Sequence, residues 1–161
     1  FQDGMEWGPR SLGNRSILAD PTHKSIKNIL NLSIKKRELF RPFAPIVLEE
    51  FAEEYFYMNG CNSKFMNVVF KAKDITIKKF PSVVHIDRTS RVQTVNRDDN
   101  RKVFNLLSDF NAITGSPILI NTSLNIKGPI AMSPVDAFNF FIESGIKTLI
   151  LNNWIIENKN S

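Results

Sequence analysis

The residues best suited to chemistry lie in the first third of the chain, where basic side chains alternate with turn-forming residues. Between Gly8 and Ile46 there are eight Lys and Arg residues against two acids, Asp20 and Glu38. The eight are Arg10, Arg15, Lys24, Lys27, Lys35, Lys36, Arg37 and Arg41. Because the whole chain has a formal net charge of only +5, this segment holds most of the basic character and predicts an anionic partner.

Arginine and glycine distinguish the start of this segment from an ordinary basic tail. Arg offers a rigid fork of donors that matches phosphate or carboxylate at two points, whereas Lys acts as a point charge. Gly8 and Gly13 flank Arg10 and let backbone N–H groups approach an anion closely. We therefore predict a preformed pocket for a phosphorylated small molecule, although charge alone fits a solvated basic face equally well.

Polar residues also follow apolar stretches further along the chain. Residues 117–121 (PILIN) predict a short buried strand that runs directly into Thr122, Ser123 and Asn125. Residues 87–93 (DRTSRVQ) place Arg91 among hydroxyl and amide side chains where another strand ends. Such side chains can donate to phosphate or bind an amide, but they are also common at ordinary strand-to-turn junctions.

Four stretches, in order, resemble the carboxy-terminal domain of the O-carbamoyltransferases. They read GMEWGPRSLGNRSILADP from Gly4, KKRELFRPFAP from Lys35, SRVQTV over 90–95 and TGSPILINTSLNIKGPI over 114–130. The family includes nodulation-factor and antibiotic carbamoyltransferases. The resemblance covers the chain from Phe1 to about Trp154. Four motifs in order are far more specific than any one of them.

The resemblance implies a fold, a reaction and a further domain. The family's domain has a YrdC-like fold, a twisted mixed β-sheet with packed helices and a concave basic cavity. Its implied reaction joins carbamoyl phosphate and ATP into carbamoyl-adenylate, with Mg²⁺ expected alongside ATP. A larger amino-terminal domain of the actin and hexokinase ATPase class then passes the carbamoyl group to an acceptor hydroxyl. We therefore expect residues 1–161 to form one α/β or α+β domain, a fragment of a longer polypeptide.

Six side chains, carried over by motif, form the implied site. They are Arg10, Lys35, Arg41, Arg91, Asn121 and Ser123. The resemblance implies that all six bind substrate, with Arg10 and Arg41 gripping phosphate. It also implies that Lys35, Arg41 and Arg91 act catalytically, through positioning and electrostatics without a covalent nucleophile. No dedicated carboxylate cluster for a metal ion is expected.

A non-catalytic module that binds RNA or nucleotide is the alternative interpretation, because the sequence pI is about 9.4. Against it, the aromatic residues fall in apolar stripes rather than at exposed stacking positions. The direction of the cations separates the two interpretations. Cations that line one concave pocket favour a small ligand, whereas cations spread over a convex face favour nucleic acid.

Composition excludes several other classes of protein. A chain of 161 residues with 42% hydrophobic residues can bury a core, and no apolar run reaches membrane-spanning length. Cys61 is the single cysteine, which excludes a disulfide within the chain. The two histidines, His23 and His85, lie far apart, which disfavours a zinc site. We predict a cytoplasmic protein without a membrane partner.

Periodicity and capping residues predict a mixture of helices and strands. Helices are expected over 20–32, 49–57, 98–114 and 134–144. Strands are expected over 43–48, 65–70, 75–77, 82–86, 117–121, 148–151 and 154–156. The helix over 98–114 is expected to begin at a capping Asp98 or Asp99 and to end at Gly115. Its buried stripe is expected to comprise Val103, Leu106, Leu107, Phe110 and Ile113.

Overall fold

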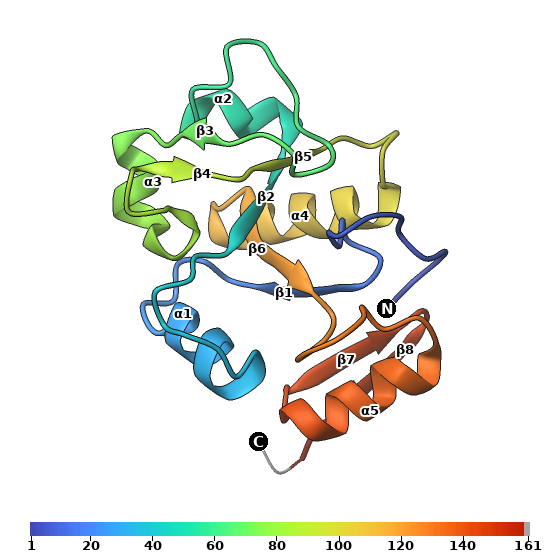
Figure 1. Cartoon of the computed structure of the whole chain (residues 1–161). Helices are drawn as coiled ribbons and strands as arrows, with labels where there is room; N and C mark the ends of the chain where they lie inside the picture. Colours follow the sequence, from blue (N-terminus) through green and yellow to red (C-terminus); the bar gives the residue numbers. More distant parts are fainter. Residues whose placement is uncertain (160–161) are drawn as a thin grey trace.

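The computed structural model describes residues 1–159 and shows a mixed α/β fold with one larger and two smaller sheets (Figure 1). The central sheet has four strands in the order β1-β6-β2-β5. Their bounds are β1 Ser16–Ala19, β2 Ala44–Leu48, β5 Gln93–Val95 and β6 Ile118–Ser123. Strand β6 is antiparallel to both β1 and β2, whereas β2 and β5 run parallel. The expected mixed class is confirmed.

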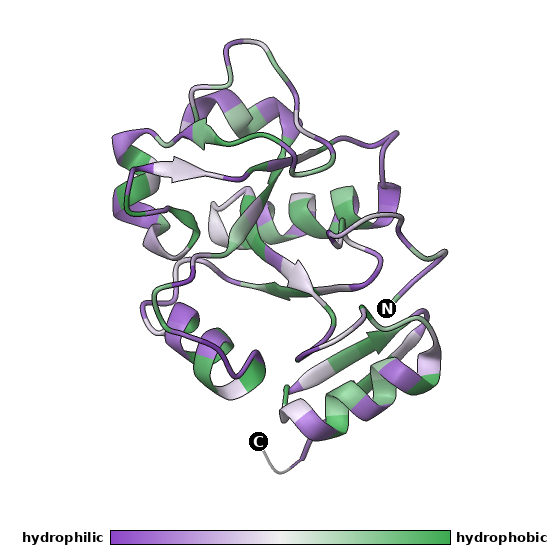
Figure 2. Cartoon of the chain, in the orientation of Figure 1, coloured by the Kyte–Doolittle hydropathy of each residue, from purple (hydrophilic) through white to green (hydrophobic). Residues whose placement is uncertain are grey.

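Apolar side chains cover both faces of the central sheet. Helix α4 (Arg101–Thr114) packs on β2 and β6, where Val103 and Leu107 meet Ile46, Leu48 and Leu119. A larger core that includes Val47, Ile118 and Ile120 lies on the other face. All five residues of β2 are buried, and Figure 2 shows the apolar character of this strand. Strands β2 and β6 therefore form a rigid centre for the molecule.

The C-terminal part of the chain forms a helix and a hairpin as expected. Helix α5 (Pro134–Ser144) begins with a capping box between Ser133 and Asp136 and ends at Gly145 in the left-handed conformation. Strands β7 (Thr148–Leu151) and β8 (Trp154–Glu157) pair antiparallel, with α5 packed on β7. The strand expected over 148–151 is confirmed, but it is not buried as its apolar sequence suggested, because Leu149 is its one buried residue.

Helix α4 differs from the prediction at its start and along its stripe. It begins three residues later than expected, because Asn100 supplies the cap and accepts from the Val103 N–H at 3.2 Å. Its end at Gly115 is confirmed. Leu106 and Ile113, expected in the buried stripe, are exposed. At 14 residues α4 is the longest helix of residues 1–159, and none in that range has the length and apolar character needed to cross a membrane.

The region between 65 and 90 contains less strand than predicted. Apart from an isolated bridge between Ala72 and Phe56, only β3 (Phe70–Lys71) and β4 (Thr89–Ser90) pair there. The expected strand over 75–77 is helix α3 (Asp74–Lys79), in which Thr76 is the buried residue and donates to the Tyr55 carbonyl. The expected strand over 82–86 is a 3-10 turn, η3 (Pro81–Val83), followed by irregular chain. Tertiary contacts have overridden the alternating pattern.

Two other expected helices are shorter than predicted. The segment over 20–32 opens with a turn in which Asp20 accepts from Thr22, and α1 (Ile26–Asn28) leads into the π-helix η1 (Ile29–Ile34). The segment over 49–57 comprises η2 (Glu49–Phe51) and α2 (Ala52–Tyr55), after which Phe56 pairs with Ala72. The π-helix matters most for function, because it delivers Lys35 and Arg37 to the end of β6.

Candidate functional site

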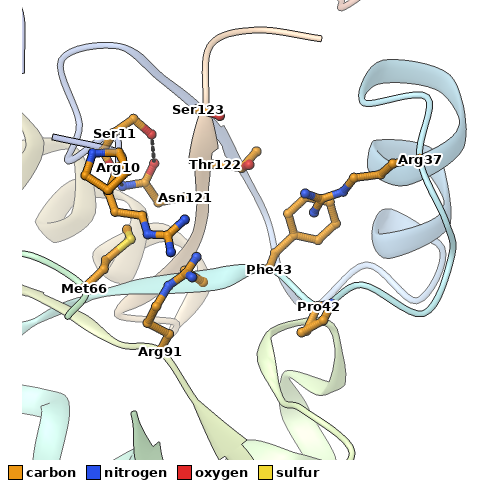
Figure 3. Close-up of a pocket in the computed structure, with 12 residues that line it drawn as sticks. Arg10, Ser11, Arg37, Pro42, Phe43, Met66, Arg91, Asn121, Thr122 and Ser123 are labelled. Atoms are coloured by element: carbon orange, nitrogen blue, oxygen red, sulfur yellow. Dashed lines mark hydrogen bonds between the residues drawn. The ribbon is translucent and has the colours of Figure 1, made fainter. Parts of the chain in front are cut away.

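A small pocket opens where the end of β6 meets the start of β2. These ends are adjacent because the strands are antiparallel, with Ala44 paired to Asn121. The pocket has a volume of about 110 Å³. It is lined by residues 9–11, Arg37, residues 42–44, Met66, Arg91 and residues 121–123 (Figure 3). Four other parts of the chain (residues 9–11, Arg37, Met66 and Arg91) therefore meet the two strand ends at one hollow.

Three guanidinium groups face this pocket without a carboxylate partner. Figure 3 shows Arg10 and Arg91 side by side, with Arg37 on the opposite wall. Within residues 1–159, no acidic residue lines the pocket and no ion pair involves these three side chains. Burial, reinforced by the charges of Arg10 and Arg37, lowers the pKa of Arg91. Its buried Nε makes no hydrogen bond to any described residue.

Arg37 was not selected from the sequence, although it lines the pocket directly. Its Nε donates to Asn31 Oδ1 at 2.7 Å, and its guanidinium lies 4.6 Å from the centroid of the Phe43 ring. Asn31 is itself buried in η1 and donates to the Arg41 carbonyl at 2.9 Å. The sequence did offer one signal for Arg37. Its guanidinium has the same fork of donors that favoured Arg10, and it lies two residues after Lys35 in the same motif.

Asn121 is a buried link between β6 and the loop that carries Arg10. Its Nδ2 donates to the Ser11 carbonyl at 3.1 Å and to Gln93 Oε1 at 2.7 Å. Gln93 in turn donates to the Leu12 carbonyl at 2.8 Å. Both amide hydrogens of Asn121 are thus used to hold the loop. Its side-chain oxygen, 3.5 Å from the Ser11 hydroxyl, can accept from an amine.

Lys35 lies behind the pocket rather than in its lining. The side chain is buried, and Nζ contacts the carbonyl and hydroxyl oxygens of Ser123 at 2.9 and 3.2 Å. It also contacts the carbonyl and side-chain oxygens of Asn125 at 2.7 and 2.8 Å. Burial, with a smaller effect from Arg37, lowers the pKa of Lys35 to about 8. Lys35 therefore fixes the chain that leaves β6, including the pocket residue Ser123.

Arg41 lies outside the pocket lining. Its Nε is 2.9 Å from Glu38 Oε2, and about half of its side chain is exposed. Of the six residues predicted from the sequence, the structure brings Arg10, Arg91, Asn121 and Ser123 to one pocket. Lys35 touches that group through Ser123, whereas Arg41 pairs with a carboxylate at the surface.

Two further observations concern the ligands that this region can accept. Within residues 1–159, no cluster of three or more His, Cys, Asp or Glu side chains could hold a metal ion. The prediction that aromatic residues avoid exposed positions is wrong near the pocket, because Trp7 is 97% exposed and Phe65 is 63% exposed. Both residues line a second hollow that shares Arg10 and Arg91 with the first.

The chain matches the family described as Carbamoyltransferase C-terminus over residues 1–158. It is 40% identical to nodulation protein NolNO of Sinorhizobium fredii, over 99% of the chain and 24% of that protein. It is 38% identical to nodulation protein NolO of Bradyrhizobium diazoefficiens, over 98% of the chain and 29% of that protein. Nodulation protein U of the same organism is 44% identical over 75% of the chain and 21% of its own length.

The chain spans between a fifth and a third of the length of the curated relatives it matches. The family match covers all four motifs that carried the resemblance, as well as every residue that lines the pocket. The chain belongs to the C-terminal domain family of the O-carbamoyltransferases.

Proposed function

We propose that this chain is the carbamoyl-activating part of an O-carbamoyltransferase. It binds carbamoyl phosphate and ATP. Hydrolysis of carbamoyl phosphate releases inorganic phosphate and leaves carbamate, whose attack on the α-phosphorus of ATP displaces pyrophosphate and forms carbamoyl-adenylate. A second, amino-terminal domain then passes the carbamoyl group to an acceptor hydroxyl, and AMP is released. Family membership supports carbamoyl transfer in general, and the relatives' greater length leaves room for the second domain. A YrdC-like arrangement of residues 1–161 as one domain is part of the same proposal.

One observation carries the proposal: three guanidinium groups that have no acidic partner among residues 1–159 converge on a pocket of about 110 Å³. Carbamoyl phosphate and ATP are both anionic, so bringing them together requires positive charge that is already fixed in place. Arg10, Arg37 and Arg91 line this pocket, and their guanidinium groups can donate to such an anion. The oxygens of Asn121, Thr122 and Ser123 on the β6 wall match the NH₂ group of a carbamoyl moiety.

The remaining predicted residues take roles that follow from their positions. Lys35 acts through Ser123, whose backbone and hydroxyl oxygens it holds. Arg41 joins the phosphate contacts by exchanging Glu38 for the ligand. Mg²⁺ would enter with ATP and offset part of the charge of its phosphates, since the described residues offer no cluster of their own. The proposed compartment is the cytoplasm, where the single Cys61 stays reduced.

Calorimetric titration with carbamoyl phosphate tests the site. We expect Arg91→Ala and Arg37→Ala each to weaken binding by at least about tenfold, because a charge-assisted contact to a desolvated anion contributes roughly 1.5–3 kcal/mol. Arg97→Ala is the matched control, because Arg97 is exposed and lines none of the hollows that contain Arg10, Arg37 or Arg91. All variants should keep the wild-type melting temperature within a few degrees.

The proposal fails if the wild-type chain does not bind carbamoyl phosphate. It also fails if both pocket variants bind as tightly as Arg97→Ala does. Pyrophosphate release in the presence of ATP and carbamoyl phosphate is the corresponding measurement of turnover, since adenylation liberates the β- and γ-phosphates together.

A further inference from the structure

The pocket between Arg37 and Arg91 is too small for a whole nucleotide. Its volume is about 110 Å³. Sites that enclose a drug-sized ligand measure roughly 300–1,000 Å³. A phosphate or a carbamoyl phosphate fits this space, but a nucleoside does not. If ATP binds here, most of it must lie elsewhere.

A second hollow, with a volume of about 500 Å³, adjoins the first. The two hollows share Pro9, Arg10, Met66 and Arg91, so the same two guanidinium groups border both. Trp7, Phe65 and Asn67 line only the second hollow. A ligand whose phosphates reach Arg10 and Arg91 can therefore extend into this second space without leaving the protein surface.

The two aromatic residues of the second hollow are exposed to solvent. Trp7 and Phe65 are among the most exposed large hydrophobic residues of the described chain. Proteins stack nucleobases on exposed aromatic rings that lie beside guanidinium groups. Any base can stack in this way, because every base has a flat π-face. The same rings would have no use beside a ligand that consisted of phosphate alone.

The backbone on the Phe65 side is held in an unusual conformation. Met66 has φ of +53°, a left-handed value that L residues adopt at a cost. Its side chain is buried in the wall common to both hollows, whereas its neighbours Phe65 and Asn67 are exposed. Such strain concentrates at binding sites. Here it directs a ring and an amide to the same side of the wall.

We propose that the hollow between Trp7 and Phe65 is the subsite for the base of a nucleotide whose phosphates contact Arg10 and Arg91. The inference rests on the proposed function, since it places the remainder of the nucleotide co-substrate. Asn67 makes no hydrogen bond to residues 1–159 and reads the edge of the base. An amide offers one donor and one acceptor, which match N7 and the amino group of adenine, whereas the same edge of guanine presents two acceptors.

Tryptophan fluorescence gives a direct test, because the chain has two tryptophans, Trp7 and Trp154. In a Trp154→Phe background, ATP and adenosine should quench Trp7, whereas inorganic phosphate should not. Trp7→Ala and Phe65→Ala should each weaken ATP binding by about tenfold and leave carbamoyl phosphate affinity within twofold. Asn67→Leu should reduce the preference for ATP over GTP. Phe40→Ala, at an exposed aromatic outside both hollows, is the matched control.

The outcomes separate this inference from the proposed function. If the wild-type chain binds ATP and carbamoyl phosphate but both aromatic variants retain full ATP affinity, the base subsite is wrong and the proposed function stands. If neither ligand binds the wild-type chain, both proposals fall. A single-stranded oligoribonucleotide that quenches Trp7 at lower concentration than ATP would assign the hollow to RNA and overturn the inference. Both aromatic residues are exposed, so unchanged melting temperatures should confirm that the variants fold.

Discussion

At the scale of single residues, Lys35 carries the clearest pH dependence in the molecule. Its ammonium is buried among four neutral oxygens of Ser123 and Asn125, and no carboxylate of the described residues pairs with it. Burial lowers its pKa from 10.5 to about 8. Between these two values the unfolded chain keeps a proton that the folded chain has released. Stability contributed by this group therefore rises as the pH increases through this window.

We expect the free energy of unfolding to rise between pH 7.5 and 9.5 by up to about 1.4 kcal/mol per pH unit from this group. Urea denaturation at several pH values measures the effect. Tyr55 does not interfere, because burial raises its pKa above 10. The rise should disappear in Lys35→Met and persist in Lys127→Met, a control at an exposed lysine. A rise of equal size in both variants would assign the titration to another group.

Residue types and motifs could predict part of the site. Arg10 and Arg91 were selected for charge and context, and both line the pocket. Arg37 was missed, because the run Lys35-Lys36-Arg37 gives no indication of which cation turns inward. In the structure, Lys36 lies between these two cations and has a left-handed φ of +46°. Lys35 can then point behind β6 while Arg37 reaches the pocket, and a local pattern does not encode that conformation.

At the scale of elements, the loop that carries Arg10 is docked on helix α4 at one glycine. Gly13 has φ of +125°, and a Cβ at this position would come within 2.6 Å of Val103 Cγ2. Gly8 has a similar φ of +100°, but a Cβ at this position would have nothing within 4 Å. Substitution to Ala strains the backbone at both positions, whereas a collision with α4 occurs only at Gly13.

We expect Gly13→Ala to lower the free energy of unfolding by about 1–3 kcal/mol more than Gly8→Ala does, which is the usual cost of overpacking. Urea denaturation measures the difference. Val103→Ala should partly rescue Gly13→Ala, because it removes the colliding methyl groups, so the double variant should be more stable than the sum of the single effects predicts. Equal losses in the two glycine variants, with no rescue, would show that the loop is not held by this contact.

Elements with strong local signals were predictable, and elements that depend on tertiary contacts were not. Helix α5 has its capping box and terminal glycine, and its bounds were predicted closely. Helix α3 has six residues and is held by the buried contact of Thr76 with the Tyr55 carbonyl. Helices this short have little stability of their own and leave little local signal in the sequence. The alternation of Ile75 and Ile77 therefore predicted a strand.

At the scale of the whole molecule, sheet pairing assembles the site. Strand β6 lies between β1 and β2, so residues 121–123 come beside residues that are about 75–110 positions earlier in the chain. The hydrogen bond from Asn121 to Ser11 spans 110 residues. Four motifs in order indicated a common family, but only the topology shows which of their side chains share one pocket. Local periodicity carries no information about such long-range pairing.

The convergence of cations on one hollow predicts how the affinity for carbamoyl phosphate changes with salt concentration. The net charge is +5, but three of the cations are fixed around one hollow rather than spread over a convex surface. Partly buried charges are screened less than exposed ones, for which the Debye length is about 8 Å at physiological ionic strength. Carbamoyl phosphate binding should therefore weaken by less than about tenfold between 50 and 200 mM salt.

Nucleic acid offers the contrasting case in the same calorimetric series. A protein that neutralises six to ten phosphates loses about 10³–10⁵ in affinity over this range of salt, through counterion release. We expect a single-stranded oligoribonucleotide to bind the chain weakly at 50 mM salt and not measurably at 200 mM, where carbamoyl phosphate still binds. RNA binding that persists at 200 mM and displaces carbamoyl phosphate would show that the guanidinium cluster serves a polymer instead of a small ligand.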